Sequence, residues 1–300
     1  MNKFPQGGSY SDVHGALIAD KRFDDARWLV DKMYLTHLDK PEFIQAETAT
    51  TDKMVGDLTS MKHPSDQAEG ENSSGDGAQV GSSGYGARIG SSGYGAKIGS
   101  SGNYAQVGSS GYGARIGSSG YGAKIGSSGN YAQIGSSGDG AKIGSSGDGA
   151  KIGSSGYGAQ VGSSGYGAKI GSSGNYAQVG SSGYGARIGS SGNYAQIGSS
   201  GDGAKIGSSG DGAKIGSSGY GARIGSSGYG AKINASGKGS VVACAGSVKR
   251  IVLGENGCAS VPWHDGKRTR IAVAYVGENG IEANTPYCVN DEGQFVKINE

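Results

Sequence analysis

The chain has 300 residues, of which 63 are glycine, 34% are hydrophobic and 17% are charged. With four phenylalanines and two tryptophans, it lacks the large apolar side chains that fill the core of an ordinary domain of this size. This excludes a barrel, a dinucleotide-binding domain or another large enzyme fold. Five prolines and no three-residue glycine period exclude a collagen helix. The remaining classes are a repeat structure and a disordered chain.

Charge is unevenly spread along the sequence. Residues 1–72 hold 8 basic and 13 acidic side chains, residues 73–233 hold 12 and 5, and residues 234–300 hold 7 and 7. The acidic segment 1–72 and the basic segment 73–233 could attract each other or different partners. Neither net charge is large enough to identify a partner. No apolar run has the length of a signal peptide or a membrane span, which favours a cytoplasmic protein.

Residues 1–55 predict a small helical head. A helix over 23–38 would carry an apolar face and end before Pro41. A head of this size has a marginal core, so its apolar face must pack on the end of the repeats, on a second copy or on a target. Residues 56–72 then form a polar linker. Three side chains of the predicted helix are candidate partner-binding residues: Trp28, Met33 and Tyr34.

From residue 73 to 233 a nonapeptide of the form S-S-G-(Y/N/D)-(G/Y)-A-(K/R/Q)-(I/V)-G repeats 18 times. A flexible Gly/Ser linker has no reason to keep a β-branched residue at one phase. Alternation of Ala, a polar residue and Ile is typical of a half-buried strand. The expected strand is Gly/Tyr-Ala-Lys-Ile, with the Gly-Ser-Ser-Gly that follows as a turn and the serine pairs at corners.

Nine residues are too few to close a coil around a core. Two copies make a flattened coil with one strand on each side, so 18 copies would give about nine coils, roughly 43 Å long at a strand spacing of ~4.8 Å. Ala and Ile would fill a thin core, and Lys, Arg and Gln would point outward. The sequence therefore predicts an all-β solenoid.

The variable positions of the repeat are correlated. Units with Asn-Tyr have Gln at the outward position, and units with Asp-Gly have Lys in every copy but the first. One block of four units occurs twice, beginning at position 130 and again at position 193, which favours duplication of whole groups of repeats. The alternative is pairing between Asp and Lys side chains on an exposed face.

Three binding chemistries can be compared for the repeats. Calcium-binding nonapeptides need Asp two residues before the apolar position, where this chain has Ala. Ice binding favours a regular row of small hydroxyl and methyl groups, whereas the outward residue of this repeat is Lys, Arg or Gln, which are large and vary between copies. A rod with Lys, Arg and Tyr could track phosphates and stack bases, although such residues also keep a sheet soluble. The candidate binding residues are Tyr85, Arg88, Tyr94, Lys97, Tyr112, Arg115, Tyr121 and Lys124.

Residues 234–300 predict a β-rich C-terminal cap. Strands are expected over 240–245, 248–253, 270–276, 287–289 and 295–298, in a small antiparallel meander that covers the last coil. No catalytic set, metal site or cofactor is indicated, and the three cysteines, Cys244, Cys258 and Cys288, lack the spacing of a disulfide framework.

The cap carries a resemblance. Its pattern of Ile271-Ala-Val-Ala-Tyr-Val, Ile281-x-Ala-x-Thr-x-Tyr287 and Gly293-x-Phe295-Val follows short Gly-rich repeats. This resembles bacteriophage and prophage accessory proteins whose tails read I-K-A-D-T-W-Y…G-x-F-V. The resemblance covers the repeat type and the C-terminal cap, not the head. It implies a phage or mobile-element origin and action inside bacteria, and it carries over no functional residue.

Together these observations predict a non-enzymatic scaffold that presents a rigid repetitive surface to a host or phage macromolecule, most simply a protein. Interference with a host defence or nucleic-acid enzyme would follow from the resemblance. The alternatives are a structural or adhesive rod, located in the virion or at a surface, and a nucleic-acid or other polyanion binder. Homo-oligomers through the head or the cap are compatible with each function.

Overall fold

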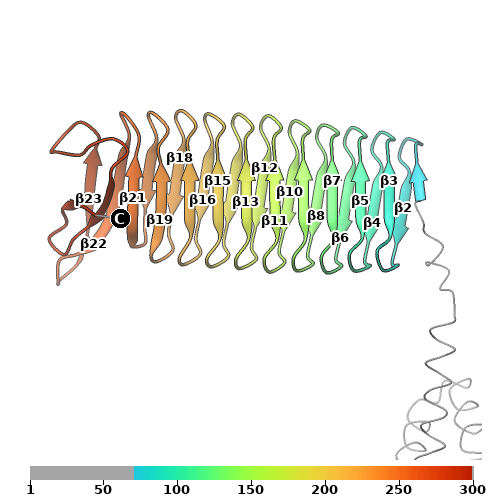
Figure 1. The fold of residues 1–300 in the computed structure, drawn as a ribbon, viewed down its shortest axis with the longest axis horizontal. Coiled ribbons are helices and arrows are strands. Elements are labelled where there is room, and N and C mark those ends of the chain that lie inside the picture. The colour runs from blue at the N-terminus through green and yellow to red at the C-terminus, as the bar shows by residue number, and fades with distance from the viewer. Residues whose placement is uncertain (1–70, 299–300) are drawn as a thin grey trace, which may run out of the picture. The chain divides into compact units, whose positions relative to one another are not determined.

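The computed structural model describes residues 71–298, which form an all-β solenoid of about ten coils without a helix (Figure 1). The predicted solenoid is confirmed. The predicted helical head and most of the linker lie outside the described residues, and with them Trp28, Met33 and Tyr34.

The strands form two sheets, named here the odd sheet and the even sheet after their strand numbers, with β24 as the exception in the odd sheet. The odd sheet contains β1 (Glu71–Ser73), β3 (Arg88–Ser91), β5 (Gln106–Ser109), β7 (Lys124–Ser127), β9 (Lys142–Ser145), β11 (Gln160–Ser163), β13 (Gln178–Ser181), β15 (Gln196–Ser199), β17 (Lys214–Ser217), β19 (Ala231–Ala235), β21 (Val248–Leu253), β24 (Pro286–Val289) and β25 (Phe295–Lys297). The even sheet contains β2 (Gln79–Ser82), β4 (Lys97–Ser100), β6 (Arg115–Ser118), β8 (Gln133–Ser136), β10 (Lys151–Ser154), β12 (Lys169–Ser172), β14 (Arg187–Ser190), β16 (Lys205–Ser208), β18 (Arg223–Ser226), β20 (Val241–Cys244), β22 (Cys258–His264) and β23 (Thr269–Tyr275).

Within the repeats, each strand pairs in parallel with the strand two repeats further along the chain. Lys151 lies beside Lys169 and Ile152 beside Ile170, with no shift of register. The same register holds in the other sheet, where Gln160 lies beside Gln178. Consecutive nonapeptides therefore alternate between the two sheets, and equivalent side chains stack in rows along each face.

The strand within each repeat lies two residues later than the sequence predicts. It is Lys-Ile-Gly-Ser, as in Lys169–Ser172, while Ala168 precedes it and the turn is the following Ser-Gly-Asn-Tyr. The prediction that both serines of the pair lie at a corner is therefore wrong, because the first serine lies inside the strand. Ser172 is buried and Ser173 exposed. A serine is small enough to fill the narrow interior beside Ile, which the pattern of the sequence does not show.

The core is thin and aliphatic, as expected. The alanines are nearly all fully buried and the Ile and Val side chains keep a few per cent of their surface, with one inward serine per repeat added to them. Because every coil places the same side chains at the same height, each new coil buries the apolar surface of the one before it.

Asp and Asn at the fourth position of the repeat connect neighbouring coils. In nine cases Oδ1 accepts a hydrogen bond from the backbone N–H at the same position two repeats later, at 2.7–3.0 Å. The carboxylate of Asp148, for example, accepts from Tyr166 N–H. These oxygens bond to the backbone of the next coil, so they do not support the alternative in which Asp pairs with Lys.

The solenoid continues beyond the last nonapeptide. β21 pairs in parallel with β19, and β22 pairs in parallel with β20. The first strands of the region predicted to be an antiparallel meander therefore continue the coils of the solenoid. Antiparallel pairing begins only at β23, β24 and β25. The sequence does not predict β22 because it contains Pro262, which usually argues against a central strand. Pro262 is tolerated because β20 pairs with β22 only as far as Ser260.

Candidate ligand-binding surface

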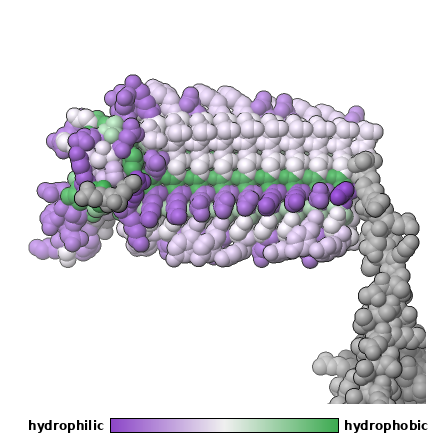
Figure 2. All heavy atoms as spheres, in the orientation of Figure 1, coloured by the Kyte–Doolittle hydropathy of each residue, from purple (hydrophilic) through white to green (hydrophobic). Residues whose placement is uncertain are grey.

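Three rows of outward-facing residues run along each face of the rod. The first is the outward Lys, Arg or Gln, the second is the outward glycine of the strand, and the third is the exposed second serine. Figure 2 shows one face, with a hydrophilic row beside a stripe of Ile residues and paler rows of small residues beyond it. The Ile side chains point inward, so their visible part is mainly backbone, and the glycines leave a trough between the two polar rows.

The two faces differ in charge. On the even face, the nine repeat strands carry seven cations and two glutamines: Gln79, Lys97, Arg115, Gln133, Lys151, Lys169, Arg187, Lys205 and Arg223. On the odd face, strands β3 to β19 carry five cations and four glutamines: Arg88, Gln106, Lys124, Lys142, Gln160, Gln178, Gln196, Lys214 and Lys232. The even face is thus the more positive one.

The even face also has the longest run of cations. Lys151, Lys169, Arg187, Lys205 and Arg223 follow one another on five adjacent strands. At a strand spacing of ~4.8 Å this row extends over about 19 Å. On the odd face three glutamines interrupt the row at its centre.

The trough of the even face is hollowed along most of its length. A groove of about 1440 Å³ runs from β2 to β18 between the Lys/Arg row and the glycines. A second groove of about 1120 Å³ lies on the other side of the glycines, along β8 to β20, where the serines line it. The five-cation row is flanked by the first groove, and the second runs parallel to it. The hollows on the odd face are smaller and are divided into separate stretches.

Tyrosines stack along the two corners of the rod. Tyr166 and Tyr184 lie with ring centroids 5.3 Å apart and planes at 9°, and Tyr94 and Tyr112 are similar. These rings are about half exposed or more, and the ladders break where a repeat has Asp-Gly. In the Asn-Tyr repeats the tyrosine takes the glycine position with a positive φ, as at Tyr104 (φ 57°). This shift keeps the ring in the ladder, since Tyr104 contacts both Tyr85 and Tyr121.

The structure separates the residues that the sequence groups as one binding set. Lys97 and Arg115 lie on the even face, while Arg88 and Lys124 lie on the odd face. Tyr94 and Tyr112 share one corner, and Tyr85 and Tyr121 are connected through Tyr104 at the other. The glycine and serine rows that line the grooves are absent from the sequence-based set, although their members lie two and four residues after each cation, as Gly153 and Ser155 do after Lys151.

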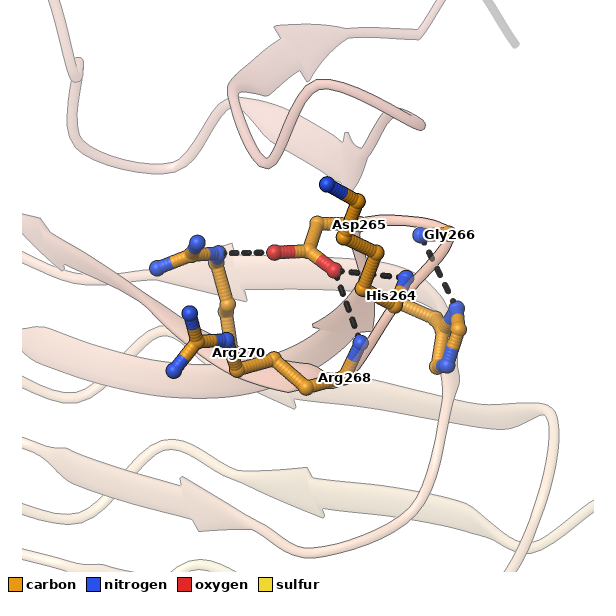
Figure 3. Close-up of polar contacts among 6 residues, drawn as sticks. His264, Asp265, Gly266, Arg268 and Arg270 are labelled. Carbon is orange, nitrogen blue, oxygen red and sulfur yellow. Dashed lines mark hydrogen bonds and ion pairs between the residues drawn. The ribbon is translucent and has the colours of Figure 1, made fainter.

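A polar cluster lies at the hairpin between β22 and β23 (Figure 3). The carboxylate of Asp265 accepts hydrogen bonds from the backbone N–H groups of Lys267 and Arg268, both at 2.8 Å, and pairs with the Arg270 guanidinium. The two backbone donors, with Arg270, lower the pKa of Asp265 to about 2. His264 Nδ1 accepts from Gly266 N–H at 3.0 Å. These contacts are all local, so the cluster shapes the turn.

The three cysteines are free thiols. Burial raises the pKa of Cys244 to about 11, so its thiol is protonated at neutral pH and unsuited to nucleophilic attack. Between residues 71 and 298 no group of three or more His, Cys, Asp or Glu side chains is placed to hold a metal ion. In the same part of the chain no helix has the length and apolar character needed to cross a membrane.

Comparison with known proteins finds two short matches. Residues 1–38 match the YdhT N-terminal domain family. A stretch of 50 residues is 48% identical to the uncharacterized protein YdhT of Escherichia coli K12, which is 17% of this chain and 18% of that relative. The match thus spans less than a fifth of the curated relative. No solved structure matched the chain.

Proposed function

We propose that the protein is a non-enzymatic rod whose even face binds an extended polyanion along the axis of the solenoid. The observation that carries this proposal is the coincidence of five consecutive cations, from Lys151 to Arg223, with grooves on both sides of the glycine row. Following the resemblance of the tail to bacteriophage proteins, the macromolecule belongs to the bacterial host, and its capture interferes with the enzymes that act on it.

Rigidity supports this reading. A ligand that lies along the rod meets a cation on every coil of the row without ordering the protein, because the in-register strands already hold the side chains in line. The row of outward glycines lets the ligand approach the backbone, whereas a larger side chain at these positions would keep the ligand away from it. Charges along the ligand would be matched by Lys and Arg, and its polar groups by the serine hydroxyls of the second groove.

The tyrosine ladders limit which polyanion features are recognised. A base inserted between two rings would need about twice the ~3.4 Å spacing of stacked bases. The ring centroids of Tyr166 and Tyr184 are 5.3 Å apart, so adjacent rings of the ladder leave no room for a base between them. The proposed ligand is therefore recognised through its backbone charges, and a nucleic acid would bind without use of its bases.

Two matched variants test the proposal. The even-face variant replaces Lys151, Lys169, Arg187, Lys205 and Arg223 with Gln. The control replaces the five odd-face cations, Arg88, Lys124, Lys142, Lys214 and Lys232, with Gln. Both variants have the same net charge, and Gln already occupies equivalent positions in the chain, so both should fold. Binding is measured with inorganic polyphosphate, oligo-dT and an abasic oligonucleotide of the same length, over a range of salt concentrations.

We expect the even-face variant to lose at least about tenfold in affinity and to show a shallower dependence on salt, by roughly 0.7 in log–log slope per lost contact with a single strand. The odd-face variant should stay within about threefold of the parent protein. Oligo-dT and the abasic strand should bind equally well. Equal losses in the two variants, a preference for the strand with bases, or no binding of any of the three probes would refute the proposal.

A further inference from the structure

The two sheets of the rod end differently at the C-terminal side. The last strand of the odd sheet, β25, has three residues and follows a polar turn at 290–294. The last strand of the even sheet, β23, has seven residues, Thr269–Tyr275, and lies near the end of the rod (Figure 1). Short edge strands are a common protection against pairing with other chains, and a long apolar edge is not. The end of the even sheet thus lacks a protection that the odd sheet has.

Among the described residues, β23 is paired along one edge only, with β22. Val276 N–H donates to Gly257 O at 2.9 Å, and in an antiparallel pair the backbone groups of successive residues point alternately to the two sides. The backbone groups of Ala272 and Ala274 therefore face β22, and those of Ile271, Val273 and Tyr275 face the other edge. A second strand could bond to Ile271 and Val273 and to the N–H of Tyr275, whose carbonyl oxygen already accepts from Glu278 N–H at 3.1 Å.

The side chains of the same three residues are exposed and apolar. Ile271, Val273 and Tyr275 keep 57%, 53% and 51% of their surface, whereas Ala272 and Ala274 between them are buried. Outside the tyrosine ladders, they and Val241 are the large apolar side chains that the described residues expose most. An apolar stripe on an edge strand is a surface suited to strand addition.

We propose that β23 pairs with β23 of a second copy in antiparallel register, centred on Val273. In this register Val273 lies opposite Val273, and Ile271 lies opposite Tyr275 of the second copy. The three apolar side chains then cover one another, as cross-strand neighbours in a sheet do. A twofold axis at Val273 makes the contact self-complementary and closes it as a dimer.

Charge supports a second copy as the partner. The strand begins beside cations, Arg268 and Arg270, and ends just before Glu278. The register centred on Val273 brings the end of each β23 that carries Arg268 near the turn of the other copy that carries Glu278, since both residues flank the strand. A parallel pairing would instead bring like charges together. The arrangement therefore favours an antiparallel copy of the same strand.

Such a dimer would extend the binding face of the rod. The twofold axis of an antiparallel strand pair is perpendicular to the sheet, so the even faces of both copies would lie on the same side of one continuous sheet. Two cationic rows would then be available to one long ligand, which increases its effective local concentration. This consequence rests on the proposed function, whereas the dimer itself does not.

The mass of the full-length protein in solution, measured by light scattering without any polyanion, tests the proposal. We expect twice the 29.9 kDa of the chain. Val273→Lys should give a monomer, or weaken the dimer at least about tenfold. Val241→Lys is the matched control, because this valine is also exposed on the even face but continues the Lys/Arg row on a strand paired at both edges. Circular dichroism would show that both variants remain folded.

Charge exchange tests the register and the identity of the partner. Arg268→Glu alone should weaken the dimer, and adding Glu278→Arg in the same chain should restore it, since both changes meet across the twofold axis. A monomeric parent protein, a dimer that survives Val273→Lys, or a double variant that is weaker than the single one would overturn the proposal. A monomer that pairs only with a foreign strand would do the same.

Discussion

A β-carbon on Gly165 would overlap the carbonyl oxygen of Gly147, which lies directly below it in the preceding coil. The same overlap recurs at the third residue of the repeat from Gly93 to Gly228, for example between Gly156 and Gly138. The glycine that follows each serine pair is thus required by the close stacking of backbones at the corners. Coils could not approach to hydrogen-bonding distance with any other residue there.

Gly165→Ala should therefore destabilise the rod strongly, by about 3 kcal/mol or more in the free energy of unfolding. Gly162→Ala is the matched control, because this glycine faces outward and a β-carbon added to it would meet no atom within 4 Å. It should change stability by less than about 1 kcal/mol. Urea unfolding followed by circular dichroism measures both. Similar losses in the two variants would contradict the stacking described here.

Replacing an inward serine, unlike replacing Gly165, is not expected to destabilise the rod. Ser172 is one of 14 buried serines whose Oγ has no hydrogen-bond partner among the described residues, while Ser181 Oγ accepts from Gly183 N–H at 3.3 Å. An unpaired buried hydroxyl costs free energy, so Ser172→Ala should leave the rod equally stable or stabilise it by up to about 1 kcal/mol.

Ser181→Ala serves as the comparison, since it removes a hydroxyl that has a partner and should be the more destabilising of the two. Thermal unfolding of the two variants gives the ranking. If Ser172→Ala proved clearly the worse, the inward hydroxyls would have to bond to one another along the column of coils.

The sequence predicts the solenoid well because Ile and Ala recur at a fixed phase, which only a stack of equivalent strands explains. It misplaces the strand within the repeat because Gly-Ser has low strand propensity, and only the need to fill a narrow interior puts Ser172 inside. It also groups Arg88 with Lys97, because a one-dimensional pattern does not show that consecutive repeats face opposite ways.

The end of the rod is harder to predict from its residues. The apolar run at Val248–Leu253 correctly indicates β21, but the parallel pairing of this strand depends on β19, which has a different sequence pattern. β22 is not predicted because of Pro262, whose lack of an N–H matters only where β20 would have provided an acceptor. Pairing partners of this kind are set by the preceding coil, not by local propensity.

Asp265 should make the hairpin between β22 and β23 sensitive to acid. Its pKa is about 2 in the folded protein, below the ordinary value of 3.8, so its charge stabilises the fold above about pH 4 and this contribution is lost as the pH falls towards 2. Asp265→Ala should lower the Tm at neutral pH, and the difference from the parent protein should shrink as the pH is lowered from 5 to 2. A difference that is constant over this range would contradict the assigned role of the carboxylate.

The separation of cations onto two faces depends on the winding of two nonapeptides per coil. Cysteine pairs introduced into a chain without its three native cysteines test this winding directly. Lys169 and Arg187, two repeats apart, lie side by side on the even face, whereas Lys169 and Gln178, one repeat apart, lie in different sheets. We expect a short thiol cross-linker to join cysteines at positions 169 and 187 in the folded monomer and to leave those at 169 and 178 unlinked. Efficient linkage of the pair one repeat apart, without linkage of the other, would contradict this winding.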